Sequence, residues 1–399
     1  MKWVPGGVTA AKGFRAAGVS AGIKRSRKPD LALVVADAPA AAAGVLTTNR
    51  VQAAPVIISR QRLAVGRARA VVINSGCANC LTGSIGLRDA QRLSREVSRA
   101  LGIPDGEVLL ASTGLIGRRL PVARIARAVP SLVGHLSRAH HRDAAAAILT
   151  TDLRAKEAAV SARIGGRVCR LGGMAKGAGM IAPSMATMLC VVTTDVAIAP
   201  GLLRRLLRQA AARTFSRITV DGDMSTNDAV FALASGASRA SVRPGTAGAR
   251  LVQQMLLAVL GRLATCIVQD GEGASRLMRV QVLGARTEAE AQACARQVAC
   301  SPLVKTMLAG GDPNVGRIAA AAGASGAWFD PEQLDIAIGG QPVVSRGLAR
   351  RLGKSVSRSL LAHPEVEVRI HLHAGRAQGR MLTCDLTEQY VRINARYTT

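Results

Sequence analysis

Short apolar runs and segments with helical spacing follow one another along the whole chain. Asp89–Leu101 places apolar residues at helical spacing and ends before Gly102 and Pro104, which are the usual signals for the end of a helix. Short apolar runs bounded by glycine, proline, asparagine or charged residues predict buried strands. In the first third of the chain these strands are expected at Leu31–Val35, Val56–Ile58, Ala70–Ile73 and Val108–Ala111.

The rest of the chain continues this alternation. Gly165-Gly166 separates Val160–Ile164 from Val168–Leu171 and predicts a hairpin. Further helices are expected at Val122–Val129, Leu132–Ala139, Asp143–Leu149, Pro200–Thr214, Ala249–Leu260 and Thr287–Val298. Further strands are expected at Thr187–Val196, Leu277–Val282 and Val366–Leu372, with Arg380–Cys384 paired nearby. Because helices and strands are mixed throughout and no repeat is visible, we predict an α/β (α+β) fold.

The composition fits a folded protein with an aliphatic core. Its 399 residues suffice for two domains or one large layered unit, and 49% are hydrophobic while only 2% are aromatic. Lysine and arginine total 53 against 25 acidic residues, which gives a net charge of +28. A basic surface can bind a polyanion, but the arginines are scattered and few aromatics accompany them for base stacking. We therefore favour a solvated basic surface over nucleic-acid binding.

The cysteines and the N-terminal segment indicate a cytoplasmic protein. Eight cysteines are spread through a long chain, which is typical of reduced thiols in a cytosolic protein. Met1–Val8 has no apolar signal-peptide core, and the uncharged stretch Gly177–Thr194 contains Pro183 and is not expected to span a membrane. The Cys77–Cys80 pair lacks a second pair, and His371 with His373 lacks a third ligand, so no metal site is expected.

The most unusual segment is Leu171–Asp195, in which a glycine-dense stretch containing Lys176 leads into Pro-Ser-Met-Ala-Thr and an apolar strand. One interpretation is a tight turn that feeds a core strand. The other is a strained Ala186–Thr187 peptide bond whose carbonyl is attacked by the Thr187 hydroxyl. An N-to-O acyl shift and hydrolysis would then free an N-terminal threonine. Its α-amine, with a pKa of roughly 8, can act as a base for its own hydroxyl.

Four other polar segments have a chemical and a plain structural interpretation. Ser112–Gly117 can present a hydroxyl and a backbone N–H to a developing oxyanion, or it is an ordinary turn. Ile218–Asp228 contains three acids, for which a hydrogen-bonded turn network is favoured over a cation site. In Gln269–Ala274, Glu272 can bind a substrate ammonium group, or the Asp-Gly step forms a hairpin turn. Gly311–Arg317 is a turn followed by a basic residue, which can hold a carboxylate, and the plain turn is favoured.

In combination, these segments resemble the ornithine acetyltransferase family, also called the bifunctional arginine biosynthesis proteins, over nearly the full length. The most specific part is the run KGAGMIAPSMATML at Lys176–Leu189. Other matching segments are Gly7–Ala10, Ala43–Asn49, Ser112–Gly117, Thr150–Asp152, Thr219–Asp228, Asp270–Ala274, Ser301–Thr306, Asp312–Ile318 and Cys384–Thr387.

The resemblance implies a layered sandwich of helices and sheets of the self-cleaving ornithine acetyltransferase type. Cleavage between Ala186 and Thr187 would leave a chain of residues 1–186 and a chain of residues 187–399, which assemble as a heterotetramer with two copies of each. The family's roles place the nucleophile at Thr187 and the oxyanion hole at Thr113 and Gly114. The implied substrate-binding residues are Thr150, Lys176, Thr187, Glu272, Asn394 and Thr399.

The implied reaction moves acetyl from N-acetylornithine to Thr187 and then to glutamate, as a glutamate N-acetyltransferase of arginine biosynthesis. Acetyl-CoA as a second donor is left open, and no metal or organic cofactor is implied. Two alternatives come from other classes. In a related self-cleaving amidase or aminopeptidase, water would take the acyl group. A basic nucleic-acid-binding protein would have no catalytic activity.

Overall fold

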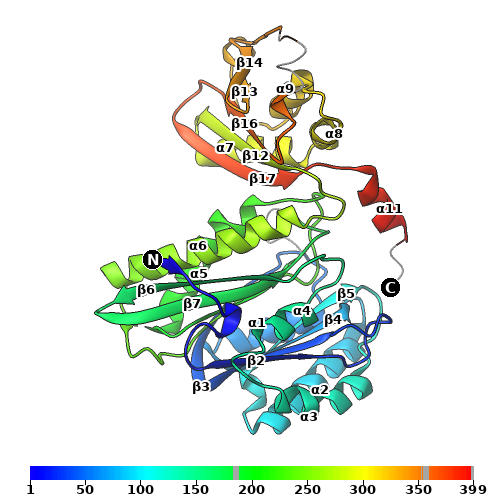
Figure 1. Cartoon of the computed structure of the whole chain (residues 1–399), viewed down its shortest axis with the longest axis vertical. Coiled ribbons are helices and arrows are strands. Elements are labelled where there is room, and N and C mark those ends of the chain that lie inside the picture. Colours follow the sequence, from blue (N-terminus) through cyan, green and yellow to red (C-terminus); the bar gives the residue numbers. More distant parts are fainter. Residues whose placement is uncertain (183–187, 352, 354–358, 397–399) are drawn as a thin grey trace.

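The computed structural model describes residues 1–182, 188–351, 353 and 359–396. Among these residues, nine strands form the first sheet, and Figure 1 shows it in the lower part of the molecule. Their order is β1 (Lys2–Trp3), β6 (Lys156–Ile164), β7 (Arg167–Lys176), β8 (Leu189–Thr194), β10 (Ala229–Ala234), β3 (Leu31–Leu46), β4 (Arg67–Cys77) and β5 (Val108–Leu115), with β2 (Phe14–Val19) also paired to β3. The β8–β10 and β4–β5 pairs are parallel and the other pairs are antiparallel.

Helices cover this sheet and link it to a second one (Figure 1). The helices beside it are α1 (Ala54–Leu63), α2 (Gly83–Leu101), α3 (Val122–Gly134), α4 (His141–Ala147), α5 (Pro200–Arg213) and α6 (Ala247–Gln269). Short 3₁₀ turns lie at Gly7–Thr9, Asp105–Glu107, Phe215–Arg217 and Pro331–Gln333. A small ribbon pairs β9 (Ala197–Ile198) with β11 (Ser241–Val242).

The C-terminal part has its own sheet and its own core. The strand order is β15 (Leu348–Ala349), β14 (Gln341–Ser345), β13 (Asp335–Ile338), β16 (Glu365–His371), β12 (Leu277–Ala285) and β17 (Ala377–Cys384). The accompanying helices are α7 (Glu288–Cys300), α8 (Pro302–Gly310) and α9 (Val315–Gly323). The last helix, α11 (Glu388–Arg396), runs back from the second sheet toward the first part of the molecule (Figure 1). The predicted layered α/β architecture is confirmed.

The apolar run at β8 explains why this strand lies at the centre of the structure. Cys190 and Val192 face the core that contains α5 and α6, whereas Leu189 and Val191 face the core on the other side of the sheet. A strand that is covered on both faces has a continuous apolar sequence rather than an alternation of apolar and polar residues. The strand predicted at Thr187–Val196 is therefore confirmed for Leu189–Thr194, and Thr187 lies outside the described residues.

Helix α6 lies between the two sheets. In the described part of the chain it is the one helix that is long and apolar enough, by length and composition, to cross a membrane. Half of its most apolar window is buried in the protein, and residues such as Leu256, Leu260 and Leu263 belong to the core shared with the first sheet. We interpret α6 as the core helix that joins the layers.

The structure differs from the predicted elements in two places. Val56–Ile58 lies in helix α1, which has a proline in its first turn and contributes side chains to two cores, so its apolar residues do not need a strand. The helices predicted at Val122–Val129 and Leu132–Ala139 are one helix, α3, that continues through Pro130 and ends at Gly134. Burial of Val129 and Leu132 on either side of the proline outweighs the backbone hydrogen bond that it removes.

The hairpin predicted at Gly165-Gly166 is confirmed. Both glycines have left-handed backbone angles, with φ of 54° and 77°, and they join β6 to β7. These angles favour glycine because a Cβ would be strained there. The hairpin fixes the register of β7 against β6. Lys176 lies at the end of β7 that is far from the hairpin.

A buried cluster of charges holds the start of β6 against the end of α6. Lys156 is 1% exposed, and its Nζ lies 2.7 Å from Asp152 Oδ1 and 2.5 Å from Asp270 Oδ2. Asp270 follows the last residue of α6 and also accepts a hydrogen bond of 3.0 Å from the backbone of Leu153. Buried charges are stable only when they are paired, so the cluster joins the segment 152–156 to Asp270, which is more than a hundred residues away in the sequence.

We expect Lys156→Met to lower the free energy of unfolding by roughly 3–5 kcal/mol, because Asp152 and Asp270 would stay buried without their shared cation. Urea unfolding followed by circular dichroism measures the change. Lys28→Met, which alters an exposed lysine, is the matched control and should change stability by less than about 0.5 kcal/mol. Equal stability of the two variants would show that the cluster does not hold the fold together.

Candidate active site

One cavity gathers every described residue that the sequence predicted for the site. Its volume is about 150 Å³, which suits a small substrate. Thr113, Gly114, Thr150, Lys176, Glu272 and Asn394 all line it. The other lining residues are Ala78, Ile116, Thr151, Gly179, Met180, Ser225, Thr226 and Asn227. The predicted cleavage residue Ala186, the predicted nucleophile Thr187 and the predicted binding residue Thr399 lie outside the described residues. We call this space the site cavity.

The predicted oxyanion segment lies at the end of β5. Gly114 has a φ of 127°, and a Cβ there would lie 2.3 Å from the carbonyl carbon of Gly76, so the position requires glycine. The Asn227 side-chain amide donates hydrogen bonds to the backbone carbonyls of Ser112 at 2.8 Å and Ala78 at 2.7 Å. This amide ties the loop after β4 to strand β5 next to Thr113, and the sequence analysis did not single it out.

Lys176 brings a buried positive charge to the cavity wall. It is the last residue of β7 and is 3% exposed. Its Nζ donates to Thr150 Oγ1 at 2.7 Å and to Thr113 Oγ1 at 3.5 Å. Burial lowers the pKa of the Lys176 ammonium, and the nearby Asp152 carboxylate opposes that shift. The arrangement suits the carboxylate of a substrate, because a cation with few water molecules around it attracts an anion strongly.

Asp152 is the carboxylate that holds this lysine in place. Its Oδ2 lies 3.7 Å from Lys176 Nζ and accepts a hydrogen bond of 3.0 Å from the Thr150 backbone. Its Oδ1 accepts one of 2.7 Å from the backbone of Gly177. Burial alone would raise the pKa of Asp152, but Lys176 and Lys156 together hold it well below its usual range. Asp152 stays ionised and therefore balances two buried ammonium groups.

Glu272 supplies the negative charge of the cavity. Its backbone N–H donates to the Ala178 carbonyl at 2.8 Å, and its Oε2 accepts a hydrogen bond of 2.7 Å from the Asn394 side chain on α11. A Cβ at Gly179 would lie 2.5 Å from this carboxylate, so a larger residue there would displace the Glu272 side chain. The alternative of an Asp-Gly hairpin at Asp270 is wrong, because Asp270 is the C-cap of α6.

Two acids of Ile218–Asp228 hold described backbone on both sides of positions 183–187. Asp221 accepts hydrogen bonds from the backbones of Met180 at 2.6 Å and Ile181 at 2.8 Å. Asp228 Oδ1 accepts one of 2.8 Å from the backbone of Met188. Burial raises the pKa of Asp228 well above its usual range, against the effects of that hydrogen bond and of Lys176. The predicted hydrogen-bonded turn network is confirmed.

The remaining segments do not contribute to the site cavity. Cys77 and Cys80 are buried, and burial raises the pKa of the Cys77 thiol. His373 Nε2 lies 2.8 Å from Asp335 Oδ2, next to the second sheet. In the turn before α9, Asn314 caps the helix and Arg317 donates to the Leu303 carbonyl at 3.0 Å, so the segment joins α8 to α9. In the described residues, no three histidine, cysteine or acidic side chains are grouped as a metal ion would require.

Comparisons with known proteins agree on one family. A model of the ArgJ family matches residues 15–399. The chain is 50% identical to the arginine biosynthesis bifunctional protein ArgJ of Nitratidesulfovibrio vulgaris over 388 residues, which cover 97% of this chain and 98% of that protein. It is 47% identical to the protein of the same name from Thermosynechococcus vestitus, with 99% of both chains covered. It is also 46% identical to the chloroplastic ArgJ protein of Sorghum bicolor, covering 100% of this chain and 88% of that protein.

Among solved structures, the ornithine acetyltransferase of Mycobacterium tuberculosis complexed with ornithine is 43% identical. That match covers 46% of this chain and 98% of that chain, with a TM-score of 0.43. The sequence relationships extend over nearly the whole length of both partners, so they concern the complete chain rather than one segment. The chain belongs to the ArgJ family.

Proposed function

We propose that this chain transfers acetyl from N-acetylornithine to glutamate through an acetyl ester on Thr187, giving ornithine and N-acetylglutamate. As a member of the ArgJ family it is an acetyltransferase of arginine biosynthesis. The detailed proposal depends on one observation. Lys176 and Glu272, which carry opposite charges, both line one small cavity beside Thr113 and Gly114. An amino acid has both a carboxylate and an ammonium group, and this cavity offers a partner for each.

The nucleophile is generated by cleavage of the chain. The Thr187 hydroxyl attacks the carbonyl carbon of Ala186, the peptide C–N bond breaks, and water hydrolyses the resulting ester. The products are the chains 1–186 and 187–399, with a free α-amine on Thr187. The hydrogen bonds from Ile181 to Asp221 and from Met188 to Asp228 support this proposal, because they fix the described backbone on both sides of the cleavage segment.

Acetyl transfer then uses two half-reactions. The Thr187 hydroxyl, with its own amine as base, attacks the acetyl carbonyl of N-acetylornithine, and ornithine leaves with the proton. The amine of glutamate attacks the acetyl ester in the second half-reaction, and Thr187 recovers its hydroxyl proton. Thr113 and the backbone N–H of Gly114 stabilise the oxyanion in each step.

The substrate contacts follow from the charges in the cavity. Lys176, with Thr150, binds the substrate α-carboxylate, and Glu272, held by Asn394, binds the ammonium group of the ornithine side chain. Thr399 completes the binding residues. We also propose acetyl-CoA as a second donor, since the relatives are named bifunctional. We further propose a cytoplasmic heterotetramer with two copies of each cleaved chain.

The cleavage proposal predicts two fragments from the 41.3 kDa wild-type chain, the second beginning at Thr187. Thr187→Ala should stay intact and lose transfer, because both cleavage and acylation need the hydroxyl. Denaturing gels with intact mass measurement read the cleavage directly. Thr306→Ala, which removes a hydroxyl on α8, is the control and should cleave like the wild type.

An intact wild-type chain that still moves acetyl groups would contradict this mechanism. The products separate transfer from hydrolysis in the same samples. Transfer predicts N-acetylglutamate that depends on added glutamate, with ping-pong kinetics. Release of acetate at the same rate with and without glutamate would instead indicate the amidase alternative.

The buried ammonium predicts a pH dependence of substrate binding. Lys176 carries its charge only below its pKa, which burial lowers from the ordinary value of 10.5. KM for N-acetylornithine should therefore rise as the pH climbs through that lowered pKa. Lys176→Met should raise KM about tenfold or more at neutral pH, a loss of about 1.4 kcal/mol, and should remove the alkaline rise. A KM of Lys176→Met that matches the wild type at every pH would rule out the proposed carboxylate contact.

A further inference from the structure

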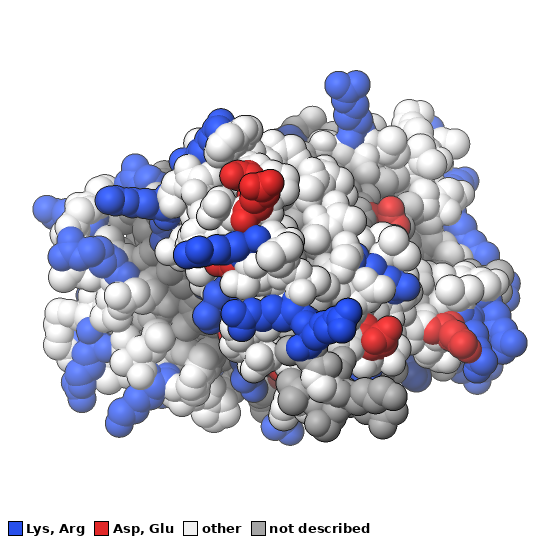
Figure 2. Space-filling view, turned by 90° about the horizontal axis from the view of Figure 1, so that it is seen from above, with Lys and Arg blue, Asp and Glu red and all other residues white. Residues whose placement is uncertain are grey.

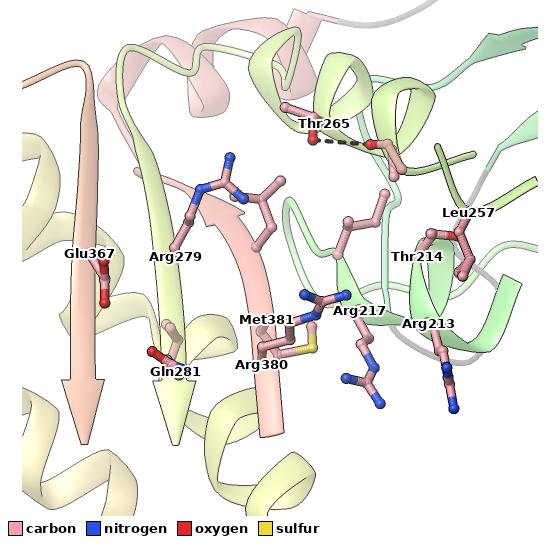
Figure 3. Close-up of a pocket in the computed structure, with 15 residues that line it drawn as sticks. Arg213, Thr214, Arg217, Leu257, Thr265, Arg279, Gln281, Glu367, Arg380 and Met381 are labelled. Atoms are coloured by element: carbon pink, nitrogen blue, oxygen red, sulfur yellow. Dashed lines mark hydrogen bonds between the residues drawn. The ribbon is translucent and has the colours of Figure 1, made fainter. Parts of the chain in front are cut away.

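A second cavity lies between helices α5 and α6 and the second sheet, and it shares no described lining residue with the site cavity. Its volume is about 600 Å³, within the range of small-molecule sites. Figure 3 shows its lining side chains, which come from the end of α5, from α6, and from strands β12, β16 and β17. We call it the arginine cavity, because Arg213, Arg217, Arg279 and Arg380 line it.

The four arginines reach the cavity from separate parts of the chain. Arg213 and Arg217 lie at the end of α5 and in the following turn, whereas Arg279 and Arg380 lie on the neighbouring strands β12 and β17. In Figure 3 the Arg380 side chain extends from β17 toward the segment that carries Arg213 and Arg217. Among the described lining residues the only acid is Glu367.

Two of these guanidinium groups already have partners, and two do not. Arg217 pairs with Glu288 at 2.8 Å, and Arg279 pairs with Glu365. Within the described part of the chain, the side chains of Arg213 and Arg380 make no ion pair or hydrogen bond. Glu367 does not neutralise them, since it pairs with Arg369 at 2.7 Å.

The arginines also affect one another. Burial lowers the pKa of the Arg380 guanidinium, and Arg217, Arg279 and Arg213 lower it further. Like charges that are gathered around a hollow, with low-dielectric protein behind them, attract anions. Guanidinium groups are also the side chains best suited to bidentate contacts with phosphate.

The other lining residues indicate what kind of molecule would carry the negative charges that the arginines attract. Ile218, Leu257, Ala264, Met381 and Leu382 give the cavity an apolar wall. A ligand that fills it therefore combines several negative charges with a body that can lie against apolar side chains. One phosphate group carries about −1.5 to −2 charges at pH 7, so a ligand with two phosphate groups offers one to each of the two unpaired guanidinium groups.

We propose that the arginine cavity binds a nucleotide with two or more phosphate groups, with the phosphates at Arg213 and Arg380 and the nucleoside against the apolar wall. The same chemistry is found in a free nucleoside diphosphate and in the nucleotide end of coenzyme A. This binding is independent of the acetyl-transfer mechanism, because it uses no residue of the site cavity.

The high arginine content of the chain calls for a matched control. Figure 2 shows basic side chains spread over the face seen from above, with few acids between them. Another cavity of about 550 Å³ is also lined by four arginines, Arg163, Arg167, Arg239 and Arg243. Removing two arginines from either cavity changes the net charge of the protein equally, so the comparison separates a built site from general attraction.

Titration calorimetry with ADP at about 0.15 M salt tests the proposal on the full protein. We expect Arg213→Gln/Arg380→Gln to bind ADP about tenfold more weakly than the wild type, and Arg167→Gln/Arg243→Gln to bind it equally well. Circular dichroism melting confirms that both variants fold. Competition by coenzyme A would identify its nucleotide end as a ligand, and ADP binding without that competition would identify a free nucleotide.

Three results would overturn the proposal. The first is no heat of ADP binding at about 1 mM. The second is an equal loss in both double variants, which would mean non-specific attraction. The third is inorganic pyrophosphate binding as tightly as ADP, which would exclude the nucleoside contact. Since the readout is binding heat, these results do not depend on whether the protein transfers acetyl groups.

Discussion

The site depends on one buried carboxylate that serves two buried lysines. Asp152 faces Lys156 on one side and Lys176 on the other, and its carboxylate offsets part of the cost of burying these two positive charges. Lys156 also holds Asp270 at the end of α6. Glu272 follows Asp270 by two residues. The ion cluster therefore positions both charged residues of the site cavity, Lys176 and Glu272. The stability of the fold and the proposed recognition of substrate therefore depend on the same charges.

A second constraint acts on the backbone around the proposed cleavage point. Asp221 and Asp228 belong to one polar loop, and they hold Ile181 and Met188 from the two sides of positions 183–187. Met188 leads directly into β8, which is covered on both faces and cannot shift without disturbing two cores. A reactive backbone segment needs flanks of this kind, since its geometry must be imposed by the surrounding structure.

Local patterns predicted the elements whose signals are local. Gly165 and Gly166 specified a hairpin because few other residues adopt their backbone angles. The strand expected at Val56–Ile58 is a helix, because a short apolar run has no period that distinguishes a strand from a buried helix. The two helices expected before and after Pro130 are one, because packing on both sides of the proline keeps α3 continuous.

The segments that carry chemistry can be identified without the structure, since the motifs around Thr113, Lys176 and Glu272 are contiguous and mark the family. That these segments meet in one cavity follows from the three-dimensional fold and not from the motifs. The fold alone revealed the roles of Asp152 and Asn227, and the convergence of the arginines between the two sheets. The physical reason is that periodicity and turn chemistry act between near neighbours along the chain. Contacts between distant residues are set by how the layers pack and by which buried charges must find a partner.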